Sequence, residues 1–173
     1  MITVINDFIS DNDFDKIQKV LLGSDITWGY SPNVAHEGDN DTGYFFHMFY
    51  NFGEPKSNYL RDGLINPILH KLKMQIPIRM KGNLYPSTQT LKQHAPHVDY
   101  EYKHKAAVFC INTCNGGTTI EGETIKSVAN RMILFDGSKP HNSSTCTDAP
   151  ARVNINFNWL DPIEPEDAPN GRT

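Results

Sequence analysis

No run of apolar residues in this sequence is long enough to cross a membrane, so no membrane-spanning segment is expected. Charge of one sign is not in excess either, because 16 basic and 20 acidic residues give a net charge of −4 without a basic tail. This balance makes nucleic acid a less favoured partner. The short basic stretch formed by Lys71, Lys73, Arg79 and Lys81 is expected to be a solvated helix end and strand start.

Cysteine is scarce, and targeting signals are missing. The three cysteines form no CxxC pair, which favours reduced structural thiols over a disulfide framework. The first residues, Met1 to Asp7, lack the basic and apolar regions of a signal peptide, so we expect a cytoplasmic protein. A chain of 173 residues is expected to form a single domain over residues 1–173, since two domains would each have little core.

Helical patterns come first along the chain, and strand patterns follow. Ser10 and Ser57 each precede apolar residues at helical spacing, and Pro67 is expected to kink the second helix. From residue 76 onward, about seven or eight short apolar or alternating runs are separated by turns. This order predicts an α+β, mainly β fold, with helices packed outside a double-sheet jelly roll. The predicted parts are N-terminal supporting elements over about residues 1–75, the jelly roll over about 76–160, and a frayed tail over 161–173.

One short motif has the residue types of a metal site. His97 and Asp99 lie in a segment that we interpret as a strand end, so their side chains share one face. His141 follows a later apolar run. Two imidazoles and one carboxylate, with coordination positions left open on one side, form the facial triad of non-haem Fe(II) oxygenases. The His-x-Asp motif alone is common by chance, so the surrounding residues have to support this hypothesis.

A second group of residues has the chemistry of an anion site. Arg152 opens a strand whose alternate residues are apolar, and it shares a face with Asn154. A buried guanidinium is costly unless an anion pairs with it, and its planar fork suits a carboxylate. Asn83 and Tyr85 lie on one face of another predicted strand and can donate hydrogen bonds to the same anion.

Together these motifs resemble those of the 2-oxoglutarate/Fe(II)-dependent dioxygenases, in a pattern similar to that of the small prolyl 4-hydroxylase-like branch. Each motif is weak by itself, and the resemblance depends on their order and spacing over roughly residues 76–159. In chain order the motifs are Asn83-x-Tyr85, His97-x-Asp99, Gly116-Gly117-Thr118, Phe135-Asp136, Pro140-His141 and Arg152-x-Asn154.

The resemblance implies a distorted double-stranded β-helix with one active site. The implied ligands of Fe(II) are His97, Asp99 and His141. The residues implied to bind 2-oxoglutarate are Arg152, which pairs with its distal carboxylate, and Tyr85, Asn83 and Asn154. The implied reaction consumes O₂ and 2-oxoglutarate, hydroxylates an unactivated C–H bond, and releases succinate and CO₂. Many members of the branch have lysine where Arg152 stands, which leaves the sub-branch open.

The sequence leaves alternatives for the substrate. The prolyl hydroxylase-like motifs imply a protein or peptide side chain, with proline first, whereas Asn83-x-Tyr85 also resembles the nucleic-acid-demethylating branch. A polar loop over residues 29–43, which is either a lid or a surface loop, contains the acidic segment Glu37–Asp41. This segment would repel a phosphate backbone, so charge favours the peptide.

Two other classes of function remain open. A jelly roll that binds a metal or a sugar without turnover is compatible with the fold. A zinc hydrolase is compatible with two histidines and one aspartate, although both alternatives leave Arg152 unexplained. Of the other histidines, His94 is expected to face away from the metal site. We expect His104 to lie in a solvated turn and His47 to lie in the core.

Overall fold

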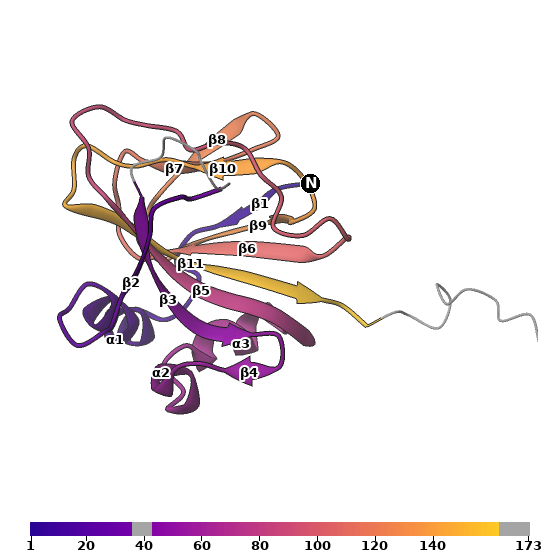
Figure 1. The fold of residues 1–173 in the computed structure, drawn as a ribbon. Coiled ribbons are helices and arrows are strands. Elements are labelled where there is room, and N and C mark those ends of the chain that lie inside the picture. The colour runs from indigo at the N-terminus through magenta and orange to yellow at the C-terminus, as the bar shows by residue number, and fades with distance from the viewer. Residues whose placement is uncertain (36–42, 163–173) are drawn as a thin grey trace, which may run out of the picture.

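The computed structural model describes residues 1–35 and 43–162, which form three layers (Figure 1). The helices within these ranges are α1 (Asp11–Leu21), α2 (Asn58–Arg61) and α3 (Asn66–Leu72). None of them has the length and the apolar character needed to cross a membrane.

Two antiparallel sheets make up the other two layers. The larger sheet has the strand order β1 (Thr3–Ile5), β9 (Arg131–Asp136), β6 (Lys105–Cys110), β11 (Ala151–Leu160), β5 (Ile76–Pro86), β3 (Tyr44–Asn51) and β2 (Gly29–Ser31), with β4 (Glu54–Pro55) paired to β3. The smaller sheet has the order β10 (His141–Ser143), β7 (Gly117–Ile120) and β8 (Glu123–Lys126). The helices lie on one side of the larger sheet and the smaller sheet lies on the other (Figure 1). The predicted mainly β, double-sheet fold with helices outside is therefore confirmed.

Strand alternation divides the side chains of the larger sheet between its two faces. On β6, Ala107 and Phe109 belong to the core shared with α1 and α3, whereas Val108 and Cys110 pack toward the smaller sheet. On β11 the odd-numbered apolar residues belong to the helix-side core. The even-numbered polar residues, Arg152 to Asn158, are buried and lie on the opposite face. The polar face of β11 is thus directed toward the space between the sheets.

The first predicted helix is confirmed, and the second differs from the prediction. The Ser10 hydroxyl accepts a hydrogen bond from the Asp13 amide at 3.3 Å, so Ser10 caps α1 as predicted. The single helix predicted after Ser57 is instead two short helices, separated where Gly63 adopts a φ of +80°. Pro67 lies in the first turn of α3, where a missing N–H costs no hydrogen bond, and it causes no kink.

The predicted loop over residues 29–43 also differs from the structure. Its first three residues, Gly29–Ser31, form β2 and pair with β3. The acidic segment Glu37–Asp41 lies outside the described residues, so the proposal of a lid remains a prediction.

Gly116 lies where the chain approaches the Arg152 side chain. A Cβ atom at this position would stand 2.3 Å from the carbonyl oxygen of Thr145. Because that oxygen belongs to the backbone, Gly116→Ala should lower the free energy of unfolding by about 1–3 kcal/mol, measured by urea denaturation. Gly82→Ala is the matched control, since its Cβ would meet Phe49 at an ordinary contact distance of 3.4 Å. An equal loss in the two variants would contradict the prediction.

Candidate metal centre

Backbone pairing brings together two segments that are far apart in the sequence. The N–H groups of His97 and His141 each donate to the other residue's carbonyl oxygen, both at 2.9 Å. The Asp99 N–H donates to the carbonyl of Gly137 at 3.3 Å. The His-x-Asp motif is therefore held by one isolated bridge to β10, and the prediction that it ends a strand is wrong.

The side chains of this motif converge on the side chain of His141. His97, Asp99 and His141 each offer one ligand atom, and these atoms all lie within 4.8 Å of one another. The Nδ1 atom of His141 lies 2.9 Å from the carbonyl oxygen of Lys139, and that of His97 lies 3.4 Å from the carbonyl oxygen of Ala95. A carbonyl can only accept, so each Nδ1 carries a proton and donates, and Nε2 is the ring nitrogen of each histidine that is left to bind an ion.

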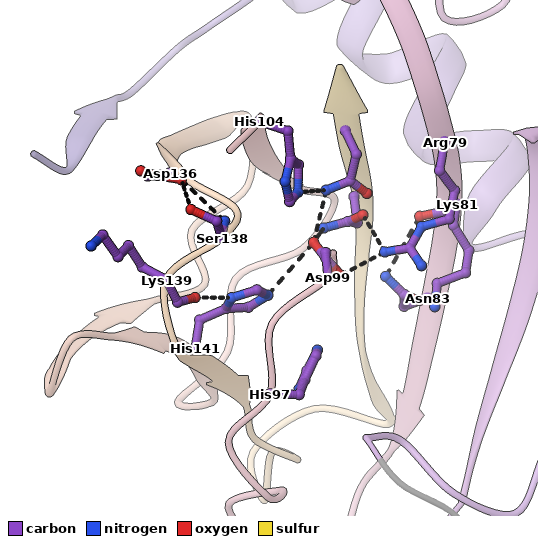
Figure 2. A network of polar contacts seen from close by, with 12 residues as sticks. Arg79, Lys81, Asn83, His97, Asp99, His104, Asp136, Ser138, Lys139 and His141 are labelled. Carbon is purple, nitrogen blue, oxygen red and sulfur yellow. Dashed lines mark hydrogen bonds and ion pairs between the residues drawn. The ribbon is translucent and has the colours of Figure 1, made fainter. Parts of the chain in front are cut away.

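Asp99 is held by polar side chains of the larger sheet. Arg79 Nη2 donates to Asp99 Oδ1 at 2.6 Å (Figure 2), and the amide of Asn158 donates to Oδ2 at 2.8 Å. Burial alone raises the pKa of Asp99, but the positive charge of Arg79, the His141 ring and the Asn158 hydrogen bond outweigh it. They hold this pKa well below its usual range, so the carboxylate is ionised at neutral pH.

The protonation states of these groups suit a divalent transition metal. Burial and the neighbouring His141 ring lower the pKa of His97 to about 4, so the His97 ring is neutral at pH 7. Neutral imidazole and ionised carboxylate are the ligand forms that such a metal requires. Over residues 1–35 and 43–162, this is the one group of three histidine, cysteine or acidic side chains close enough to share an ion.

The residues predicted to bind the cosubstrate lie beside this group, on β5 and β11. The register of the two strands places Arg152 opposite Tyr85 and Asn154 opposite Asn83. The Asn83 amide nitrogen donates to Asn154 Oδ1 at 3.0 Å, and the buried Asn83 Oδ1 has no hydrogen-bond partner among the described residues. Asn83, Tyr85 and Asn154 line one pocket together with His97, Asp99 and His141.

Arg152 is fully buried, with an exposed fraction of 0%. Its Nη2 donates to Thr118 Oγ1 at 2.7 Å and its Nη1 donates to the Ser144 carbonyl at 3.3 Å, while its Nε has no partner within residues 1–35 and 43–162. None of the ion pairs in the described part of the chain includes it. A buried cation without a counter-ion is strongly disfavoured, so this position fits a ligand that brings a carboxylate.

The prediction that Arg79 and Lys81 are solvated is wrong. Arg79 is 18% exposed and Lys81 is half-buried, and both line the same pocket on the face of β5 that carries Asn83 and Tyr85. The Lys81 ammonium donates to the hydroxyl of Tyr44 at 3.0 Å. Burial, with the nearby charge of Arg79, lowers the pKa of Lys81 to about 8. The spacing in the sequence could have indicated this burial. Both residues lie at even spacing from Asn83, so the three side chains share one face of the strand.

The lowered pKa of Lys81 predicts a stability that depends on pH. An unfolded lysine has a pKa of about 10.4, so burying the charged form costs free energy below pH 8, and this cost declines as the pH rises to about 10.4. Relative to Lys81→Met, the wild type should gain about 1–3 kcal/mol of unfolding free energy between pH 7 and pH 10. Urea denaturation of both proteins at the two pH values measures the gain. A difference that does not change with pH would contradict the prediction.

His104 is buried, with 4% of its surface exposed, and the predicted solvated turn is wrong. Its Nδ1 lies 2.9 Å from the carbonyl of Tyr102, and its Nε2 lies 3.3 Å from the Asn158 amide nitrogen. The same amide donates to Asp99, so His104 supports the residue that orients this carboxylate.

Neither His94 nor His47 belongs to the group of three. The His94 ring packs 5.1 Å from the Tyr85 ring and its Nδ1 lies 2.8 Å from Ser143 Oγ. His47 is half-buried, and its ring nitrogens contact Thr27 and Ser57. The expectation of a histidine in the core is therefore only partly met at His47.

Comparison with known proteins identifies the fold. No protein-family model and no curated protein matches the sequence. A prolyl-4-hydroxylase from Pseudomonas putida is similar over 92% of both chains, with a TM-score of 0.59 and 13% identity. A prolyl hydroxylase from Trichoplax adhaerens, in complex with a hypoxia inducible factor peptide fragment, matches 99% of this chain and 87% of its own, with a TM-score of 0.58 and 16% identity. An oxidoreductase of the 2OG-Fe(II) oxygenase family from Burkholderia pseudomallei matches 92% and 84%, with a TM-score of 0.69 and 8% identity. The shared fold is that of the 2-oxoglutarate oxygenases.

Proposed function

We propose that this chain is an Fe(II)- and 2-oxoglutarate-dependent oxygenase that hydroxylates an unactivated C–H bond. The proposal depends on one pocket, which is lined by the three side chains that could share a metal ion. Beside them lies the wall of β5 and β11, where Arg152 is buried and has no counter-ion among the described residues. The proposed reaction converts O₂, 2-oxoglutarate and a C–H bond into succinate, CO₂ and a hydroxylated product. The fold shared with oxygenases of this kind supports the proposal.

The metal would be held by His97, Asp99 and His141. Bound Fe(II) supplies the redox chemistry that couples O₂ and 2-oxoglutarate to hydroxylation, and the protein supplies geometry. The backbone carbonyls at the two Nδ1 atoms keep both Nε2 atoms available. Arg79 and Asn158 hold the carboxylate of Asp99 in its ionised form.

The cosubstrate would be held by the wall of β5 and β11. Arg152 offers its charge to the distal carboxylate of 2-oxoglutarate, and Tyr85, whose ring lies 5.6 Å from the guanidinium, restricts its position. Asn83 and Asn154, directly opposite each other, provide amide groups farther along the same wall. Because these residues are buried, the wall excludes water from the ion pair that would form.

For the substrate we propose a protein or peptide side chain, with a nucleobase as the alternative. The two prolyl hydroxylases with the same fold support the first, and one of them was solved with a peptide. The net charge of −4 also favours it, because binding a nucleic acid depends on neutralising phosphates.

The test is the formation of succinate from 2-oxoglutarate with Fe(II) in air, with peptide and nucleobase pools as stimulants. Mass spectrometry of the stimulating pool should show the gain of one oxygen atom. Activity with Zn(II) in the absence of O₂ would instead support a hydrolase. The absence of any metal-dependent succinate formation and of 2-oxoglutarate binding would contradict the proposal.

A further inference from the structure

Two cations of β5 face the pocket at the end where Asp99 lies. Figure 2 shows Arg79, Lys81 and Asn83 along one strand, beside Asp99. Both cations line the pocket that contains the three metal-ligating side chains. Neither cation has a role in holding 2-oxoglutarate in the function proposed above.

Hydrogen bonds within the pocket do not use all the donors of this pair. Arg79 pairs with Asp99, but its Nε is buried and has no partner in the part of the chain that the structure describes. Lys81 donates to Tyr44, and no ion pair of the described residues includes it. An ammonium group has three donors, so donors remain for a ligand.

The balance of charge in the pocket points in the same direction. Among the described residues that line the pocket, Asp99 is the one acidic side chain, while Arg79, Lys81 and the underlying Arg152 are basic. A divalent metal and a doubly charged 2-oxoglutarate would cancel each other. The described side chains of the site would then keep an excess of positive charge that a neutral substrate leaves uncompensated.

The position of the pair separates it from the proposed cosubstrate wall. Lys81 is opposite Asn156 and Arg152 is opposite Tyr85, so the two levels are four positions apart. This spacing corresponds to roughly 13 Å along the strand. The pair Asn83 and Asn154 lies between them. Lys81 therefore lies at the level where Asn156 contacts both Asp99 and Arg79, away from the level of Arg152.

We propose that Lys81 and Arg79 bind a carboxylate of the primary substrate. The substrate would then carry this carboxylate close to the C–H bond that is hydroxylated. The inference rests on the oxygenase function proposed above and narrows its substrate class. The carboxylate belongs either to a small organic acid or to an acidic side chain of a peptide. Both sources present the same group to the two cations.

Binding of a minimal probe tests the inference without turnover. Protein loaded with Zn(II) and saturating 2-oxoglutarate is titrated with acetate and with the isosteric neutral acetamide, and binding is followed by ligand-observed NMR. Acetate should bind the wild type at least about tenfold more tightly than acetamide, and Lys81→Met should remove this preference. Lys81→Gln, which keeps a donor without the charge, serves where Lys81→Met does not fold.

A matched lysine outside the pocket provides the control. Lys105 is exposed and pairs with Asp161, so Lys105→Met should bind acetate as the wild type does. Equal binding of acetate and acetamide, or an unchanged preference in both Lys81 variants, would overturn the inference. So would a Lys81→Met variant that loses affinity for 2-oxoglutarate, because Lys81 would then belong to the cosubstrate site. Failure of the wild type to bind 2-oxoglutarate with Zn(II) would instead refute the oxygenase function.

Two larger probes identify the source of the carboxylate. The first is free L-aspartate, and the second is aspartate blocked at its amino and carboxyl groups, which keeps the side-chain carboxylate alone. Similar affinity for both supports an acidic side chain of a peptide. A preference of about tenfold or more for the free amino acid supports a small acid.

Discussion

His141→Ala should abolish turnover of 2-oxoglutarate and weaken metal binding at least about 100-fold, because it removes one of three protein ligands. The fold should survive, since the hydrogen bonds between His97 and His141 that join the two segments use backbone atoms alone. The alanine variant keeps those bonds and loses the imidazole.

Titration with Co(II) measures the affinity, and thermal unfolding reports the fold. His70→Ala is the matched control, because His70 lies exposed on α3 and should leave the affinity unchanged. Asp99→Ala is a poorer test, since it leaves Arg79 buried beside the site without its carboxylate and costs about 3–5 kcal/mol. Unchanged metal affinity in His141→Ala would show that the metal, if one binds, lies elsewhere.

Local patterns explain which elements could be predicted. Ser10 caps α1 through its own hydroxyl, and alternation on β11 separates Arg152 and its polar neighbours from the apolar residues of the core. Each of these features depends on residues near in sequence. The register that places Arg152 opposite Tyr85 depends on two strands far apart in the chain, and a sequence pattern does not determine it.

The burial of Lys81 and His104, which differs from the prediction, depends on residues far away in the sequence. Charge on a strand is typical of a solvated face, and Lys81 is half-buried because the opposing pocket walls cover it. His104 was expected in a solvated turn, but the amide of Asn158 and the chain at Gly137 enclose its ring. Polar residues at every second position of a strand thus indicate a buried site, even where their charges favour a solvated face.

The proposed role of Arg152 depends on its burial more than on its contacts. In the described structure it is bonded to one hydroxyl and one carbonyl, which are weak compensation for a charge with no exposed surface. A carboxylate bound at this position would gain an ion pair shielded from water and salt. The distal carboxylate of 2-oxoglutarate is therefore expected to depend on this residue for most of its binding energy.

Arg152→Ala should raise the dissociation constant of 2-oxoglutarate roughly 100- to 10,000-fold, because removing one partner of a buried ion pair costs about 3–5 kcal/mol. Metal affinity should change little, since Arg152 belongs to the wall and the metal ligands come from other segments. Calorimetric titration of the metal-free protein with Zn(II) measures the metal affinity, and titration of the Zn(II)-loaded protein with 2-oxoglutarate measures the cosubstrate affinity. Arg152→Lys keeps the charge but loses the planar fork, so it should restore part of the affinity, and Tyr85→Phe should cost only a few-fold. A change below about threefold in Arg152→Ala, in a protein that unfolds at the wild-type temperature, would mean that the cosubstrate carboxylate binds at another position. Arg79 and Lys81, the cations among the described residues that line the pocket, would then be the residues to test.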